Sequence, residues 1–175
     1  MPESSSPLRL PLERLIVMGV SGCGKSTLAH AIADHLRWSM IEGDQYHSET
    51  SREKMSHGVP LTDEDRATWL NTLARLMADA RAPTVMTCSA LKASYRDTLR
   101  AHSRQRLGFV YMKLTQEASF QRVSQRKNHP FPASLVASQF AALESPSGEP
   151  DVLTLDANDT TDTQVAAVRH WLQTL

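Results

Sequence analysis

Short apolar runs alternate with segments of helical periodicity along most of the chain. Apolar runs of about four residues that end at turn residues are typical of strands buried on both faces. Apolar residues spaced three and four apart, as in residues 26–36, indicate a helix with one buried side. The pattern predicts five strands, at residues 15–18, 38–41, 84–88, 107–112 and 152–155. It predicts helices at residues 26–36, 63–80, 90–101, 117–126, 133–143 and 163–172, and a helix with loops within 44–60.

Strands that alternate with helices indicate right-handed βαβ units and a parallel sheet. We therefore expect an α/β fold in which a five-stranded parallel sheet is flanked by helices on both faces. Residues 1–13, with several serines and prolines, are expected to form a flexible N-terminal tail, and residues 14–175 a single domain. No internal repeat or long linker divides this domain.

Composition excludes some classes of partner. Lysine plus arginine number 19 and so do aspartate plus glutamate, which gives a net charge of zero in 175 residues. No strong basic field is present to attract nucleic acid or an anionic membrane. The only two cysteines, Cys23 and Cys88, do not make a disulfide framework. No apolar segment reaches transmembrane or signal-peptide length, so we expect a cytoplasmic protein that binds neither nucleic acid nor membrane.

The strongest motif is a full match to G-x-x-x-x-G-K-[ST] between a predicted strand and a predicted helix. Glycines let the backbone curl so that successive N–H groups point at phosphate oxygens, and the following helix adds its positive dipole end. Lys25 supplies a charge to the β and γ phosphates, and the Ser26 hydroxyl is placed to bind Mg²⁺. The motif predicts a three-layer P-loop NTPase fold that binds ATP at Gly19, Val20, Ser21, Gly22, Cys23, Gly24, Lys25, Ser26 and Thr27.

A phosphate loop does not by itself name the acceptor, since GTPases, ATPase motors and small-molecule kinases all have one. The chain contains no N-K-x-D guanine signature and no D-x-x-G switch motif. It is also short for a motor. The sequence therefore favours a small kinase.

Candidate acceptor residues follow the second and third predicted strands, whose carboxyl ends border the ligand crevice in such a sheet. Asp44 follows strand two, where a carboxylate can orient or deprotonate an acceptor hydroxyl; the alternative is that it only caps the next helix. Lys92 and Arg96 lie one helical turn apart and could bind an anionic group of the substrate, or could form a solvated face. No Walker-B aspartate stands near Cys88, and the histidines lack metal-ligand spacing.

A segment broken by two prolines, at residues 127–132, suggests a lid. In small kinases such a segment is often mobile, and its arginines close over the triphosphate. We expect a lid at about residues 122–135, with Arg122 and Arg126 as nucleotide ligands; ordinary surface arginines are the alternative. His129 lies beside this lid.

Four blocks together resemble the gluconate kinases (gluconokinases) of the P-loop small-molecule kinases, over nearly everything from Leu15 onward. The phosphate loop is one. The other three are Gly43-Asp44-Gln45-Tyr46-His47 with Lys54-Met55, Gly58, Pro60-Leu61, Asp63, Asp65-Arg66 and Trp69-Leu70; Cys88-Ser89-Ala90-Leu91-Lys92 with Tyr95-Arg96-Asp97; and Ser138-Gln139-Phe140 with Leu143-Glu144 and Pro146.

The resemblance implies transfer of the ATP γ-phosphoryl group to the 6-hydroxyl of D-gluconate, with Mg²⁺, in a homodimer. It implies Lys25 and Asp44 as catalytic residues, and Asp44, His47, Lys92, Arg96 and His129 as substrate ligands. The chain departs from the family at Ser48, where proline is frequent, at Ser51, where asparagine is frequent, and at Pro130, which follows His129 directly.

Three alternatives remain open at the level of sequence. A shikimate kinase is disfavoured because no two glycines are adjacent, and an adenylate kinase because D-G-[FY]-P-R is absent. A non-catalytic nucleotide-binding regulator is disfavoured because Lys25 and Ser26 are intact.

Overall fold

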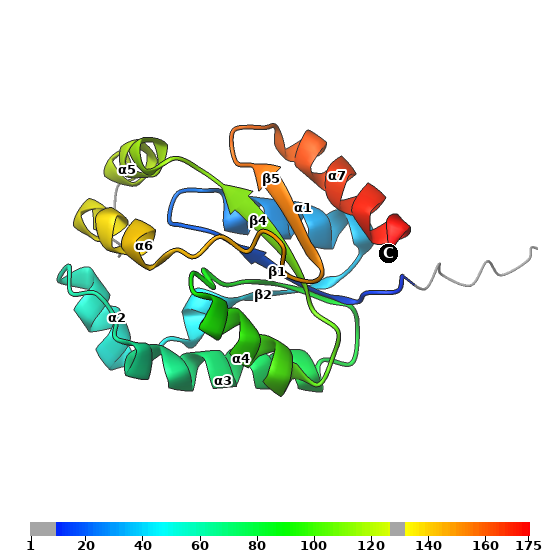
Figure 1. The fold of residues 1–175 in the computed structure, drawn as a ribbon, viewed down its shortest axis with the longest axis horizontal. Coiled ribbons are helices and arrows are strands. Elements are labelled where there is room, and N and C mark those ends of the chain that lie inside the picture. Colours follow the sequence, from blue (N-terminus) through cyan, green and yellow to red (C-terminus); the bar gives the residue numbers. More distant parts are fainter. Residues whose placement is uncertain (1–9, 127–131) are drawn as a thin grey trace, which may run out of the picture.

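The computed structural model describes residues 10–126 and 132–175. It confirms the expected α/β fold: five parallel strands form one sheet in the order β2-β3-β1-β4-β5 (Figure 1). The three inner strands are buried, with β1 buried at all five positions, whereas the edge strands β2 and β5 are partly exposed. The strands are β1 Arg14–Met18, β2 Ser39–Glu42, β3 Thr84–Thr87, β4 Gly108–Lys113 and β5 Val152–Asp156.

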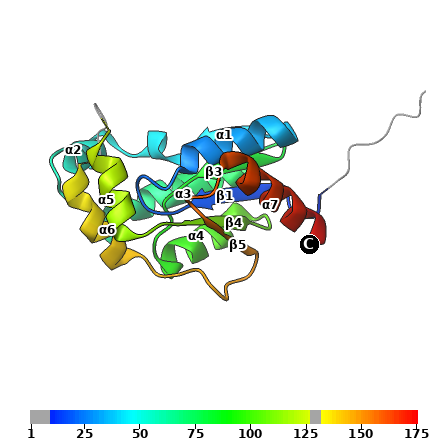
Figure 2. The same ribbon diagram turned by 90° about the horizontal axis from the view of Figure 1, so that it is seen from above.

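Helices cover both faces of the sheet, which makes three layers (Figures 1 and 2). One face carries α1 and α7, the other α3 and α4, and α2, α5 and α6 gather at the end where the strands finish. The helices are α1 Lys25–Leu36, α2 Glu49–Ser56, α3 Asp63–Asp79, α4 Ala93–Ser103, α5 Gln116–Ser124, α6 Val136–Ala142 and α7 Thr161–Thr174, with short 3₁₀ turns η1 Gly43–Tyr46 and η2 Ala133–Leu135.

The helix predicted from Thr62 onward forms as expected. Thr62 Oγ1 accepts a hydrogen bond from Asp65 N–H at 3.1 Å, and Asp65 Oδ2 accepts one from Thr62 N–H at 2.9 Å, which makes a capping box. Trp69, Leu73 and Met77, spaced four apart, are buried against the sheet. This helix therefore presents a fixed apolar side to the core and directs its first turn toward the carboxyl ends of the strands.

The start of α4 differs from the prediction. The helix expected from residue 90 begins at Ala93, because Ala90 adopts a left-handed conformation (φ +45°) and Lys92 is an extended cap residue. The departure at Ser48 also has a structural reason: its side chain accepts a hydrogen bond from Ser51 N–H at 3.0 Å and caps α2. The lid predicted at 122–135 lies partly outside the described residues.

None of the helices in residues 10–126 and 132–175 is long and apolar enough to cross a bilayer.

Candidate active site

The phosphate loop connects β1 to α1 with a backbone that only its glycines allow. Gly19 has φ +146°, and a Cβ there would lie 2.8 Å from Cys23 Sγ and 2.9 Å from Met112 O. Gly24 has φ +91° and immediately precedes the first residue of α1. The loop therefore fits tightly on the end of the sheet, and its amides and the α1 N-terminus form a site for anions.

Lys25 lies over this loop. Its Nζ donates hydrogen bonds to Gly19 O at 2.9 Å and to Val20 O at 3.0 Å. Ser26 and Thr27, in the first turn of α1, are exposed, so their hydroxyls are accessible to a ligand. The charge, the hydroxyl and the amides that phosphoryl transfer needs thus come from one continuous segment.

Helices α5 and α6 hold the outer side of the same loop. Ser119 Oγ donates to Ser21 O at 2.7 Å, and Ser21 N–H donates to Gln139 Oε1 at 2.7 Å. Arg122 donates from Nη1 to Gly22 O at 3.0 Å and from Nη2 to Asn158 Oδ1 at 2.9 Å. Arg122 therefore contacts the phosphate loop, and its role as a nucleotide ligand stays a prediction. Sequence reasoning missed Ser119, Gln139 and Asn158 because these contacts join segments 36 to 118 residues apart.

The residues expected to bind the acceptor begin at Gly43, directly after β2, and close packing fixes the position of this glycine. A Cβ at Gly43 would lie 2.0 Å from Thr87 O, so no other residue fits at this position. Trp69 Nε1 donates to Gly43 O at 2.8 Å, and Thr87 Oγ1 accepts from Gly43 N–H at 3.1 Å. These bonds position the next residue, Asp44, whose side chain is 72% exposed beside the phosphate loop's end of the sheet.

His47 lies between Asp44 and the helix α3. Its ring stacks on Trp69 with centroids 4.0 Å apart, and its Nε2 lies 3.8 Å from Asp44 Oδ1. Burial lowers the pKa of His47 from its ordinary value, Asp44 opposes this, and the cations Arg66 and Arg52 add to it. The ring is therefore neutral at pH 7. Its Nδ1 is buried without a hydrogen-bond partner in the described part of the chain.

Lys25, Asp44 and Arg66 all lie near Cys88, directly after β3. Burial, with a smaller contribution from the charge of Asp44, raises the pKa of the Cys88 thiol to about 12, although a hydrogen bond with the Ala90 backbone and the charges of Lys25 and Arg66 act in the opposite direction. A single buried thiol thus lies within electrostatic reach of all three groups. Lys25 and Asp44, predicted as catalytic residues, are brought to one end of the sheet, and Arg66 joins them there although the sequence analysis gave it no role.

Lys92 takes part in a polar cluster between α3 and α4. Its Nζ donates to Asp63 Oδ1 at 3.0 Å, and Tyr95 OH donates to the same carboxylate. Hydrogen bonds from Tyr95 and Lys92 hold the pKa of Asp63 below its usual range. Both Lys92 Nζ and Arg66 Cζ lie 5.6 Å from the centre of the Tyr95 ring. Lys92 thus has Arg66, and not Arg96, as its cationic neighbour over this ring.

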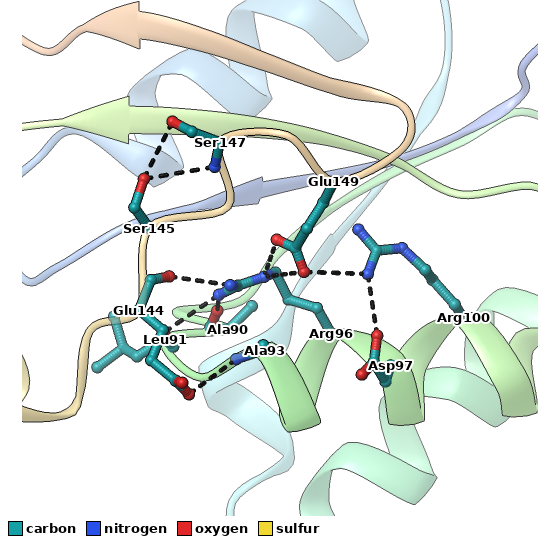
Figure 3. Close-up of polar contacts among 10 residues, drawn as sticks. All are labelled: Ala90, Leu91, Ala93, Arg96, Asp97, Arg100, Glu144, Ser145, Ser147 and Glu149. Atoms are coloured by element: carbon teal, nitrogen blue, oxygen red, sulfur yellow. Dashed lines mark hydrogen bonds and ion pairs between the residues drawn. The ribbon is translucent and has the colours of Figure 1, made fainter.

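The expectation that Arg96 and Lys92 share an open helix face and bind an anion together is wrong. The Arg96 side chain is 0% exposed, and its polar contacts are drawn in Figure 3. Nε donates to Glu149 Oε2 at 2.8 Å, Nη1 to Ala90 O at 2.7 Å and to Leu91 O at 3.1 Å, and Nη2 to Glu144 O at 2.9 Å. Because four of the five guanidinium N–H donors are occupied, Arg96 holds the turn that precedes Lys92, and we do not carry it forward as a carboxylate ligand.

His129 and Arg126 were also predicted as site residues. His129 is not among the described residues. Arg126 lies at the exposed end of α5, where its N–H donates to Val123 O at 3.2 Å; its proposed role over the nucleotide stays a prediction.

The described residues contain no group of three or more His, Cys, Asp or Glu side chains that could hold a metal ion. This fits Mg²⁺, which usually keeps several waters and binds substrate phosphates with one or two protein ligands. The exposed Ser26 hydroxyl at the start of α1 fits the role of that protein ligand.

The loop, Lys25 and the carboxylate of Asp44 at the end of this α/β sheet define a P-loop kinase of small molecules. A family model described as an AAA domain matches residues 15–146. The gluconokinase of Gluconobacter oxydans is 39% identical over 175 residues, covering 98% of each chain, and the thermoresistant gluconokinase of Escherichia coli is 37% identical, covering 87% of this chain and 89% of the relative. The chain belongs to the gluconokinase family.

Solved structures agree with this assignment. A gluconokinase from Sinorhizobium meliloti superposes with a TM-score of 0.85 at 38% identity and covers 95% of this chain and 94% of its own. A shikimate kinase from Acinetobacter baumannii has a TM-score of 0.60 at 14% identity. The second likeness shows the shared fold alone.

Proposed function

We propose that this protein transfers the γ-phosphoryl group of ATP to D-gluconate and forms 6-phospho-D-gluconate. The observation that carries the proposal is that Lys25 and Asp44 flank the end of β3. Lys25 donates to Gly19 O, and Gly19 N–H donates to Ser89 O at 3.3 Å just after β3, while Asp44 follows Gly43, whose N–H donates to Thr87 Oγ1 at 3.1 Å. The chain is also similar to gluconokinases over most of its length. The Lys25 ammonium group suits the γ-phosphate of ATP, and the Asp44 carboxylate suits an acceptor hydroxyl.

Each residue has a distinct part in the reaction. Lys25 and the loop amides stabilise the charge on the transferring phosphoryl group. Asp44 orients the 6-hydroxyl and accepts its proton. Arg122, already on the phosphate loop, and Arg126 bind the nucleotide. The Ser26 hydroxyl would hold Mg²⁺, which would supply positive charge to the phosphates of ATP.

An ADP-release screen over sugar acids, polyols and shikimate tests the proposal. Gluconate should give the highest kcat/KM, and activity should require Mg²⁺. Release of ADP with shikimate but not with gluconate would favour the shikimate alternative, and no acceptor-dependent release would favour a non-catalytic regulator. The proposal includes a homodimer in the cytoplasm; light scattering of the purified protein and cell fractionation test these two points.

A further inference from the structure

We propose that Arg66 and Lys92 bind the carboxylate of the acceptor and thereby direct its far hydroxyl to Asp44. The inference rests on the proposed function and names the groups that recognise the acid. Arg66 comes from the first turns of α3 and Lys92 from the cap of α4, so two helices that pack on the same face of the sheet supply the two cations.

The geometry favours Arg66 because its guanidinium has donors to spare. Nη1 donates to Leu61 O at 2.6 Å, and this is the one hydrogen bond of the Arg66 side chain among the described residues, where it also forms no ion pair. A guanidinium can make a bidentate pair with a carboxylate, and it presents five N–H groups in a fixed plane. Arg66 therefore offers what the buried Arg96 cannot.

Lys92 brings a second cation to the same ring. Both cations lie 5.6 Å from the centre of the Tyr95 ring, and the Lys92 side chain is 32% exposed. Its partner Asp63 has a side chain that is 69% exposed, so water can solvate that carboxylate when Lys92 turns to a ligand. Two cations near one aromatic ring make a position for an anionic group.

The unpartnered Nδ1 of His47 is a second, independent sign of a ligand. The imidazole side chain is 6% exposed, and a buried polar atom without a partner is costly. His47 lies within electrostatic reach of both Asp44 and Arg66. A polyhydroxy acid that extends from Asp44 to Arg66 passes this ring, and one of its hydroxyl groups satisfies the nitrogen.

The arrangement also explains which end of the acid reacts. Asp44 is anionic and repels the carboxylate of the substrate, whereas Arg66 and Lys92 attract it. An acyclic six-carbon acid carries its carboxylate and its terminal hydroxyl at opposite ends. The acid end is therefore held at the cations and the terminal hydroxyl is left at Asp44.

The test compares D-gluconate with its uncharged polyol, D-glucitol, in wild type and in Arg66→Met. We expect the KM for gluconate to rise about tenfold to hundredfold, as loss of a charge-assisted bond implies. The KM for ATP and the kcat/KM for the polyol should stay near wild type. Arg75→Met is the matched control, since Arg75 is an exposed arginine on the same helix, and should leave all constants unchanged.

Two further variants keep the test informative. If Arg66→Met does not fold, as judged by its thermal unfolding midpoint, Arg66→Lys and Lys92→Met should show the same selective loss for the acid, of smaller size. Equal loss for gluconate and polyol, or no loss at all, would overturn the subsite. If wild type prefers another acid, the comparison is made with that acid and its polyol, and a preference for an uncharged acceptor overturns the subsite and the proposed function together.

Discussion

Replacing Arg96 by methionine should destabilise the fold and leave gluconate recognition intact. The change keeps most of the side-chain volume but removes a fully buried charge with partners on three segments (Figure 3). Glu149, with a side chain only 20% exposed, loses its Nε partner, and the carbonyls of Ala90 and Glu144 lose their donors. Breaking a buried ion pair by removing one partner costs about 3–5 kcal/mol.

For a domain of this size, that loss corresponds to a fall in the unfolding midpoint of about 6–20 °C. The assay is thermal and urea unfolding of Arg96→Met, followed by kinetics of the folded protein at low temperature. The exposed Arg75→Met serves as the control and should unfold near the wild-type midpoint.

The result that refutes this reasoning is specific. If Arg96→Met unfolds at the wild-type midpoint and raises the KM for gluconate strongly without affecting the polyol, Arg96 does bind the carboxylate. The buried arrangement of Figure 3 would then be only one of its states. A lower midpoint together with a wild-type KM for gluconate supports a structural role.

Three other changes test the two catalytic residues and the phosphate loop. Lys25→Ala should keep the fold and lower kcat by a factor of about 10² to 10³, the size of losing one preorganised charge; near-normal turnover in a steady-state assay would contradict the assignment. Asp44→Asn should lower kcat about 10²- to 10⁴-fold with little change in ATP affinity measured by calorimetry, and the reverse pattern would make it a nucleotide or metal ligand. Gln139→Leu removes the acceptor of Ser21 N–H and should lower kcat/KM for ATP about two- to tenfold, while the exposed Gln121→Leu should not; equal constants would show that the contact is dispensable.

The nucleotide side could be predicted because its chemistry is contiguous in sequence. The phosphate loop, the strand before it and the helix after it lie within Arg14–Leu36, so a local pattern identifies all three. Of the groups that hold the outer side of the loop, only Arg122 was given a role from the sequence, and the contacts of Ser119 and Gln139 with the loop could not be predicted. Gln139 reaches Ser21 across 118 residues, and only the packing of α6 beside the loop brings them together.

The acceptor side shows why helical spacing misled the prediction at Lys92 and Arg96. Residues four apart share a face only if both belong to the helix. Lys92 is an extended cap residue with φ −97° and ψ 147°, because the left-handed Ala90 delays the start of α4. The Lys92 side chain therefore turns toward Asp63, while Arg96, one turn inside the helix, turns into the core.

The positions of the local cations explain how a chain with no net charge can bind two anionic substrates. The net charge is zero, so attraction of ATP and of an acid must come from local cations. Lys25 and Arg122 lie on the phosphate loop, whereas Arg66 and Lys92 lie over Tyr95. Two separate pairs of local cations are therefore available for the two anionic substrates, and Arg96, buried in the core, fixes the turn from which Lys92 projects.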